Sequence, residues 1–254
     1  MPLAVDMELA KRVFGCIDNT TLNGTDNVAS VEAFCRRTKE MQLADGTSVA
    51  AVCVYPSMVP CVSRALEGSG IKVASVAGAF PHGQLPLPLK VAEVKQAVSV
   101  GADEVDIVIN RGLLLAGEHD AVRDEVAAMK EACMGRTLKV ILETGELPSK
   151  ELIAKASWLA IEGGADFIKT STGKIGTGAT LEAAEVMLQV IGENVKINKK
   201  QVGFKAAGGI RKPEEALAYA ELARKILGDK YINKQTFRIG ASSLTEGLYS
   251  ILTF

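Results

Sequence analysis

Two lysines and an aspartate interrupt segments that otherwise have the apolar character of buried strands. Lys169 lies within residues 166–171, Lys205 within residues 202–206, and Asp106 in an earlier segment of the same kind. Lysine is rarely buried without a partner, because taking its ammonium group out of water is costly. One interpretation is an inward ion pair that braces the end of a sheet, or lysines whose ammonium groups reach the rim. The other is a catalytic constellation.

A catalytic interpretation explains why two lysines should be close together. With an ordinary pKa near 10.4, only about one lysine in 2,500 is neutral and nucleophilic at pH 7. A second ammonium group about 5 Å away, at an effective dielectric of ~20, disfavours the charged form by ~3 kcal/mol before burial adds its share. The pair therefore predicts an amine that attacks a carbonyl carbon, with Asp106 passing protons through a water. Spacing alone does not decide which lysine is the nucleophile.

Short polar loops follow the last three candidate strands. They contain Thr172, Gly173, Lys174, Gly208, Gly209, Ser242 and Ser243. In barrels of alternating strands and helices, loops after the seventh and eighth strands and a helix N-terminus commonly form a phosphate site. A tight turn explains Gly208-Gly209 equally well, but three such loops on one rim favour phosphate.

Four further residues have weaker signals. Asp18 ends the first candidate strand and is expected either to bind a sugar hydroxyl or to cap the next turn. His82 lies in a turn-like Pro-His-Gly sequence and is interpreted as structural, His119 as solvated, and Cys53 as part of the core.

The elements that must position these residues alternate along the whole chain. Apolar, β-branched runs typical of buried parallel strands recur eight times between segments of helical period. They lie near residues 14–18, 49–54, 71–77, 104–109, 138–143, 166–170, 201–205 and 237–241. About 250 residues suit one (β/α)8 TIM barrel, so residues 1–254 are predicted to form a single α/β domain. An open, doubly wound sheet is the competing architecture.

Helix signals support this alternation. Ala216, Ala220, Ala223 and Leu227 recur at helical spacing between Pro213 and Gly228. Ser149 is placed to cap the helix that ends at Gly163-Gly164, and Pro88 to open the one that ends at Gly101.

A short internal repeat predicts which way two side chains point. Gly-Ala-Asp occurs at residues 101–103 and again at 164–166, and three residues after each aspartate come Asp106 and Lys169. If both strands start in the same register, their alternation directs both side chains to the same face. Asp106 and Lys169 are therefore expected to share one cavity.

Composition excludes several functional classes. The formal net charge is −1 and no basic stripe is interleaved with aromatic residues, which argues against nucleic acid as a partner. The chain contains no apolar run of membrane-spanning length, and charged residues interrupt Met1–Arg12, so neither a membrane segment nor a signal peptide is expected. The expected location is the cytoplasm. Five cysteines without CxxC spacing predict reduced, mostly buried thiols, not a disulfide framework or a zinc site.

Several segments together resemble the deoxyribose-phosphate aldolase family, in family order and over essentially the whole chain. They are residues 18–22 (DNTTL), 52–56 (VCVYP), 80–83 (FPHG), 101–106 (GADEVD), 143–147 (ETGEL), 166–173 (DFIKTSTG), 203–205 (GFK) and 240–243 (GASS). The resemblance implies a class I aldolase with a TIM barrel. It also implies reversible cleavage of 2-deoxy-D-ribose 5-phosphate to acetaldehyde and D-glyceraldehyde 3-phosphate, without metal or organic cofactor.

The resemblance assigns roles that spacing leaves open. It implies that Lys169 forms the Schiff base, that Asp106 and Lys205 relay protons, and that the polar rim loops hold the phosphate. It also suggests a homodimer. The sequence departs from the family at Ala206, where proline is frequent, and at Phe254, where some members continue to a tyrosine that assists proton transfer. We expect a slightly looser loop and a lower turnover.

Two alternative functions remain open at this stage. Another Schiff-base aldolase or a transaldolase would share the barrel and the lysine but take a ketose donor. A non-catalytic sugar-phosphate sensor would bind through the same rim without forming an imine. Fold alone does not separate them, because such barrels host many chemistries.

Overall fold

The computed structural model describes residues 6–253. The expectation about Phe254, and the part of the N-terminal prediction that concerns Met1–Val5, lie outside these residues. Within them, eight parallel strands close into one barrel in chain order, with β8 hydrogen-bonded to β1. The predicted closed barrel is therefore confirmed, and the open sheet is wrong. The strands are β1 (Ile17–Thr20), β2 (Ala51–Val54), β3 (Lys72–Val76), β4 (Glu104–Val108), β5 (Thr137–Ile141), β6 (Phe167–Lys169), β7 (Gly203–Ala207) and β8 (Phe237–Ala241).

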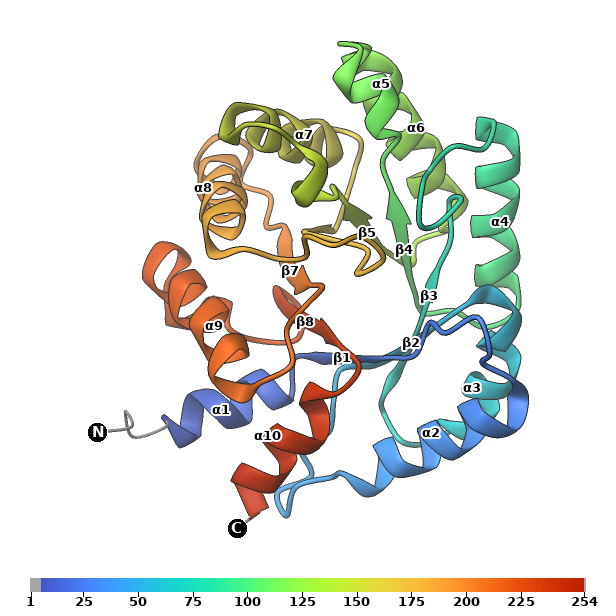
Figure 1. The fold of residues 1–254 in the computed structure, drawn as a ribbon, viewed down its shortest axis with the longest axis vertical. Helices are drawn as coiled ribbons and strands as arrows, with labels where there is room; N and C mark the ends of the chain where they lie inside the picture. Colours follow the sequence, from blue (N-terminus) through green and yellow to red (C-terminus); the bar gives the residue numbers. More distant parts are fainter. Residues whose placement is uncertain (1–5, 254) are drawn as a thin grey trace.

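Helices surround the strands on all sides, as Figure 1 shows. The α-helices are α1 (Met7–Phe14), α2 (Val28–Glu40), α3 (Val59–Ala65), α4 (Leu87–Ser99), α5 (Arg111–Leu115), α6 (His119–Ala132), α7 (Lys150–Glu162), α8 (Leu181–Asn198), α9 (Pro213–Leu227) and α10 (Leu244–Thr253). Short 3-10 helices are η1 (Pro56–Met58), η2 (Thr144–Glu146) and η3 (Asp229–Tyr231). No helix within residues 6–253 combines the length and apolar character that crossing a membrane requires.

The residues predicted to begin and end helices lie at or near the ends of helices in the structure. The Ser149 side chain accepts a hydrogen bond from the Leu152 N–H at 3.2 Å and so caps α7. Proline occupies the first turn of both α4 and α9, and Gly228 ends α9. A proline in the first turn loses no helical hydrogen bond, because the N–H groups there have no partner within the helix.

Seven of the eight strands differ from their predicted bounds by one to three residues, and the first differs most. Phe14 and the residues before it form α1, whose buried positions recur at helical spacing and whose first turn is capped by Asp6. A short apolar run does not distinguish helix from strand, so the strand predicted from residue 14 is wrong at its start; β1 begins at Ile17. The seventh strand begins at Gly203, two residues later than predicted.

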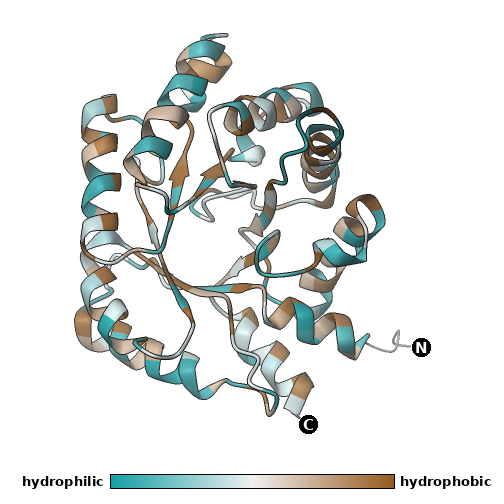
Figure 2. Ribbon diagram, turned by 180° about the vertical axis from the view of Figure 1, so that it is seen from behind, coloured by the Kyte–Doolittle hydropathy of each residue, from teal (hydrophilic) through white to brown (hydrophobic). Residues whose placement is uncertain are grey.

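Apolar side chains form two separate groups in the barrel. The larger lies between the strands and the surrounding helices. A smaller group occupies part of the barrel interior and consists of Leu22, Ala51, Cys53, Ala74 and Val76. Figure 2 shows brown, hydrophobic segments in the central strands and a mixture of teal and brown along the outer helices. All five cysteines are free and buried, as predicted.

Candidate active site

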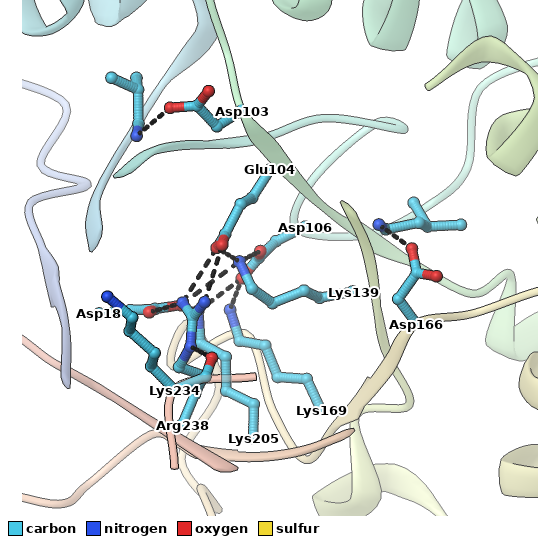
Figure 3. Close-up of polar contacts among 12 residues, drawn as sticks. Asp18, Asp103, Glu104, Asp106, Lys139, Asp166, Lys169, Lys205, Lys234 and Arg238 are labelled. Carbon is cyan, nitrogen blue, oxygen red and sulfur yellow. Dashed lines mark hydrogen bonds and ion pairs between the residues drawn. The ribbon is translucent and has the colours of Figure 1, made fainter. Parts of the chain in front are cut away.

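The remaining part of the barrel interior is charged. Seven side chains from six strands converge there, and Figure 3 shows them pointing toward one another. They are Asp18 (β1), Glu104 and Asp106 (β4), Lys139 (β5), Lys169 (β6), Lys205 (β7) and Arg238 (β8). We call them the interior charge cluster. Each is at most 4% exposed, so their charges must be compensated by one another.

Asp106 is the central acceptor of the cluster. Its Oδ2 accepts hydrogen bonds from the Nζ of Lys169 at 2.9 Å and from the Nζ of Lys205 at 2.7 Å, and its Oδ1 accepts from Lys139 at 2.8 Å. Asp106 and Lys169 therefore share one site, as the internal repeat predicted. Lys169 and Lys205 both donate to a single carboxylate oxygen. The inward ion pairs that the structural interpretation predicted are therefore present as well.

The repeated Gly-Ala-Asp sequence has a structural role of its own. Asp103 accepts a hydrogen bond from the N–H of Val73 at 3.0 Å, and Asp166 accepts one from Leu138 at 2.7 Å. Each aspartate thus ties the start of its strand to the preceding strand (Figure 3). Because both strands are attached in the same way, the side chains three residues later, Asp106 and Lys169, point in equivalent directions.

A glycine on the neighbouring strand makes room for one of the lysines. A Cβ built on Gly240 of β8 would lie 3.0 Å from the Cε of Lys205. That approach is tighter than nearly all real contacts of a Cβ atom. A side chain at this position would therefore require Lys205 and Ala207 to shift by a few tenths of an ångström.

A second group of contacts lies toward the amino ends of the strands. Lys139 lies 2.6 Å from Glu104 Oε2 and 3.4 Å from Asp18 Oδ2. Arg238 pairs with Asp18 at 2.5 Å and with Glu104 at 2.7 Å. Sequence reasoning missed Lys139, Glu104 and Arg238 as site residues. Their signal was the one that revealed Lys169: a charge inside an otherwise apolar strand.

Asp18 was expected either to bind a sugar hydroxyl or to cap a turn, but in the structure it forms ion pairs inside the barrel. Its side chain is fully buried, and its oxygens are bound by Lys205 and Arg238. It caps no turn in the structure, so that alternative is wrong. The predicted contact with a sugar hydroxyl is untested, and Asp18 does not line the cavity described below.

The surroundings set opposite protonation tendencies for the clustered lysines. Burial lowers the pKa of Lys169, Asp106 opposes this, and the Lys205 ammonium adds to the lowering, so the pKa ends below its ordinary value. Burial would also lower the pKa of Lys205, but Asp106 and Asp18 outweigh it and raise the pKa. Burial acts to raise the pKa of Asp106, yet Lys139, Lys169 and Lys205 hold it well below the ordinary range. Asp106 is therefore an anion at neutral pH.

The balance of charges in the cluster also indicates that Lys169 is the lysine that most readily becomes neutral. The cluster contains three carboxylates and four basic groups. With every group ionised it holds one excess positive charge, and a neutral Lys169 removes that excess. Lys169 is the basic group with one carboxylate partner, whereas Lys139 has three. It is therefore the amine that becomes nucleophilic most readily.

A cavity of about 260 Å³ opens above Lys169 at the carboxyl ends of the strands. Six of the predicted substrate-binding residues line it: Thr172, Gly173, Lys174, Gly208, Gly209 and Ser242. Ser243 is exposed beside Ser242 but is not part of the lining. Sequence reasoning missed Arg211, which also lines the cavity. A basic residue two positions after Gly208-Gly209 is the signal that would have found it.

Hydrogen bonds hold the rim loops against each other. The Thr170 hydroxyl donates to the Ala207 carbonyl oxygen and accepts from the Ala207 N–H, both at 3.0 Å. The N–H of Ala179 donates to the Gly208 carbonyl oxygen at 2.9 Å. The loops after β6 and β7 are thus fixed relative to Lys169. Together they form a polar, glycine-bearing wall suited to an anion.

The described residues group no three histidine, cysteine, aspartate or glutamate side chains in an arrangement that would hold a metal ion. The polar side chains that line the cavity carry amine, guanidinium, hydroxyl and amide groups, and none is a carboxylate. What this arrangement can do chemically is to form a carbon–nitrogen bond at Lys169 and to move protons at Asp106.

Comparison with known proteins extends over nearly the whole chain. A model of the DeoC/LacD family of aldolases matches residues 12–245. A relative from Caenorhabditis elegans is 46% identical over 239 residues, which make up 93% of this chain and 79% of that protein. The Mus musculus protein named deoxyribose-phosphate aldolase is 45% identical over 244 residues, covering 91% of this chain and 77% of that one.

Solved structures show the same barrel. The aldolase QR15 is 32% identical, with a TM-score of 0.79 and coverage of 98% of this chain and 97% of that one. The deoxyribose phosphate aldolase from Aeropyrum pernix, described as a unique tetrameric structure, is 25% identical, with a TM-score of 0.76 and 97% of each chain covered.

Proposed function

The chain belongs to the DeoC/LacD family of aldolases, and from that premise we propose that it cleaves 2-deoxy-D-ribose 5-phosphate reversibly to acetaldehyde and D-glyceraldehyde 3-phosphate. The reaction is that of a class I aldolase, in which a lysine imine takes the place of a metal ion. Lys169 carries the imine, and Asp106 and Lys205 move the protons.

The first step forms the imine. The neutral amine of Lys169 attacks the C1 aldehyde of the open-chain sugar, and loss of water together with uptake of one proton from solvent gives a protonated imine. The lowered pKa of Lys169, due first to burial and then to the Lys205 ammonium, supplies neutral amine at neutral pH against the opposing effect of Asp106. The protonated imine returns the cluster to one excess positive charge.

That excess charge favours the second step. Asp106, acting through a water molecule held with Lys205, takes the proton of the C3 hydroxyl as the C2–C3 bond breaks. The bonding electrons move into the imine and give a neutral enamine, and D-glyceraldehyde 3-phosphate leaves. Protonation of the enamine at C2 and hydrolysis then release acetaldehyde and the free lysine.

The phosphate is held at the far side of the cavity. Gly173, Lys174, Gly208, Gly209 and Ser242 surround this side, and Ser243 lies beside them. A phosphate fixed there sets the distance from the anion to C1, so that binding energy orients the aldehyde toward Lys169. The predicted contact of Thr172 belongs to the same wall.

One observation carries the proposal. The Nζ of Lys169 is buried at the base of the cavity and donates to the same oxygen of Asp106 that accepts from Lys205. A lysine used only for bracing gains nothing from a second ammonium group on the same oxygen. A lysine used as a nucleophile gains a lower pKa.

Trapping the imine tests the proposal directly. The protein is treated with acetaldehyde and borohydride, and the modified peptide is identified by mass spectrometry. We expect one reduced ethyl adduct, on Lys169. Absence of an adduct while deoxyribose 5-phosphate still binds would favour a sugar-phosphate sensor, and an adduct with ketose phosphates alone would favour another Schiff-base aldolase or a transaldolase.

We also propose that the protein is a homodimer, as the family resemblance implies, and that it is cytoplasmic, as the sequence pattern led us to expect. Size-exclusion chromatography with light scattering tests the dimer, and a monomer mass at micromolar concentration would contradict it. Cell fractionation tests the location.

A further inference from the structure

Glu143 is a buried carboxylate to which the proposed reaction assigns no role. It follows β5 by two residues, has a left-handed backbone with φ 56°, and its side chain is fully buried. Asp18, Glu104 and Asp106 are the other buried carboxylates of the described chain, and each pairs with a basic side chain. Glu143 pairs with none among the described residues, so hydrogen bonds alone must compensate its burial.

Both oxygens of Glu143 are bound by one residue of the cavity wall. The N–H of Thr172 donates to Oε1 at 3.1 Å, and the Thr172 hydroxyl donates to Oε2. The same hydroxyl accepts a hydrogen bond from the N–H of Lys174 at 3.1 Å. A continuous chain of contacts thus runs from the end of β5 to residues 172–174, which line the cavity beside Lys169.

Two contacts on one residue fix its orientation as well as its position. A single hydrogen bond leaves a loop free to rotate about it, whereas the paired contacts to Thr172 do not. The backbone of Glu143 is itself held, because the neighbouring N–H groups of Leu142 and Thr144 donate to the carbonyl oxygens of Lys169 and Thr170 at 2.9 Å. Glu143 is therefore a fixed support to which the loop after β6 is attached.

We infer that Glu143 is a positioning residue that holds the loop of residues 172–174 in its anion-binding form and so sets the preference for phosphorylated over free sugar. The inference rests on the proposed function, because it takes the sugar phosphate as the ligand of this loop. A loop that is already ordered binds an anion without the cost of ordering it first. Loss of the support penalises binding of the phosphate and leaves the chemistry at Lys169 in place.

Three variants test this role through a comparison of substrates. Glu143→Ala removes the support, Thr172→Val removes the hydroxyl that links Glu143 to Lys174, and Glu143→Gln keeps an acceptor for the Thr172 N–H and a donor for its oxygen. Glu146→Gln is the matched control, because Glu146 lies in the same segment, is 43% exposed and pairs with Arg111 away from the cavity lining.

The expected result is a change confined to phosphate. Glu143→Ala raises KM for deoxyribose 5-phosphate and the inhibition constant of inorganic phosphate by about tenfold or more, the usual effect of losing hydrogen bonds to a charged group. Its kcat/KM for free deoxyribose changes by less than about twofold, which identifies the loss as one of ligand binding. Glu143→Gln recovers most of the loss, and Glu146→Gln behaves as wild type.

A double variant tests whether Glu143 acts through Thr172. If it does, Glu143→Ala and Thr172→Val are not additive, and the double variant has the KM of the worse single variant. Equal loss on both sugars, additive effects, or unchanged phosphate inhibition in Glu143→Ala would each overturn the proposal. Should Glu143→Ala not fold, Thr172→Val alone tests the same contact, because it removes the hydroxyl that donates to Glu143; an unchanged inhibition constant of phosphate in that variant would overturn the proposal.

The borohydride trap separates this proposal from the proposed function. Trapping of acetaldehyde on Lys169 needs no phosphate, so it proceeds at the wild-type rate in Glu143→Ala. No adduct in the wild-type protein contradicts the aldolase mechanism, whereas a normal adduct with unchanged phosphate inhibition in the variant contradicts the role of Glu143 alone.

Discussion

Lys139 and Lys169 lie on adjacent strands and both donate to Asp106, yet their surroundings differ. Lys139, nearer the amino ends of the strands, faces three carboxylates, which outweigh burial and raise its pKa well above the ordinary value. Lys169 faces Asp106 alone and lies below an open cavity, and its pKa is lowered, first by burial. The same residue type thus has a raised pKa in one layer of the barrel and a lowered pKa, which the proposed nucleophile needs, in the next.

The difference teaches that burial alone does not make a lysine reactive. Both side chains are buried, so the desolvation cost acts on both. The number of carboxylates within reach decides the outcome. The interior charge cluster therefore divides into a lower part, around Lys139, Glu104 and Arg238, in which each basic group has at least two carboxylate partners, and an upper part around Lys169, to which we assign the proton transfers.

Replacing Lys169, the proposed nucleophile, is expected to have the largest effect on activity. Lys169→Leu loses the covalent route, and we expect kcat for deoxyribose 5-phosphate cleavage to fall by roughly 10⁴-fold or more, as when other covalent nucleophiles are removed. A coupled assay for D-glyceraldehyde 3-phosphate measures the loss. Retained activity in this variant would disprove the mechanism.

Removing the shared carboxylate tests whether the two layers are linked through Asp106. Asp106→Asn removes the negative charge that Lys139, Lys169 and Lys205 share and one of the two acceptor oxygens. We expect kcat to fall by about 10²- to 10⁴-fold, the usual contribution of a general base. Imine trapping on Lys169 should survive, since the amine remains. A variant that loses trapping and turnover together would show that Asp106 positions Lys169 and is not only a proton carrier.

Removing the lower lysine should affect stability more than chemistry. Lys139→Met leaves three carboxylates with fewer cations, and breaking such a buried network costs about 3–5 kcal/mol of the free energy of unfolding. Urea denaturation measures this cost. The control is Lys11→Met, whose ion pair with Asp45 is exposed to solvent and should leave the midpoint nearly unchanged. Equal midpoints for the two variants would contradict the distinction between the layers.

The smallest effect is the pH dependence of Lys169 itself. Because its folded pKa is lowered from 10.5, the unfolded chain binds more protons between the two pKa values, and its contribution to stability rises with pH across that window. Lys169→Met should therefore be more stable than wild type at neutral pH, with the advantage shrinking as the pH approaches 10.5. An advantage that grows with pH would mean that the pKa of Lys169 is raised. Denaturation midpoints at several pH values decide this.

The sequence by itself determined the architecture and the candidate site residues. Eight apolar runs alternating with helical segments were enough for the barrel, because parallel strands covered by helices are apolar on both faces. Charged residues within those runs indicated that Lys169, Lys205 and Asp106 belong to a site, because burying a charge without a partner is costly. The bounds of β1 were not determined, because the helical spacing of α1 ends in an apolar run that resembles a strand.

Only the tertiary structure decided which buried lysines have a raised pKa and which has a lowered one. Protonation depends on the carboxylates within about 4 Å, and these come from strands on other sides of the barrel, such as Asp18 of β1 against Lys205 of β7. The same holds for Glu143, whose partner Thr172 lies 29 residues away in the chain. Spacing along a chain determines the face on which a side chain lies, but closure of the barrel determines which charges meet across it.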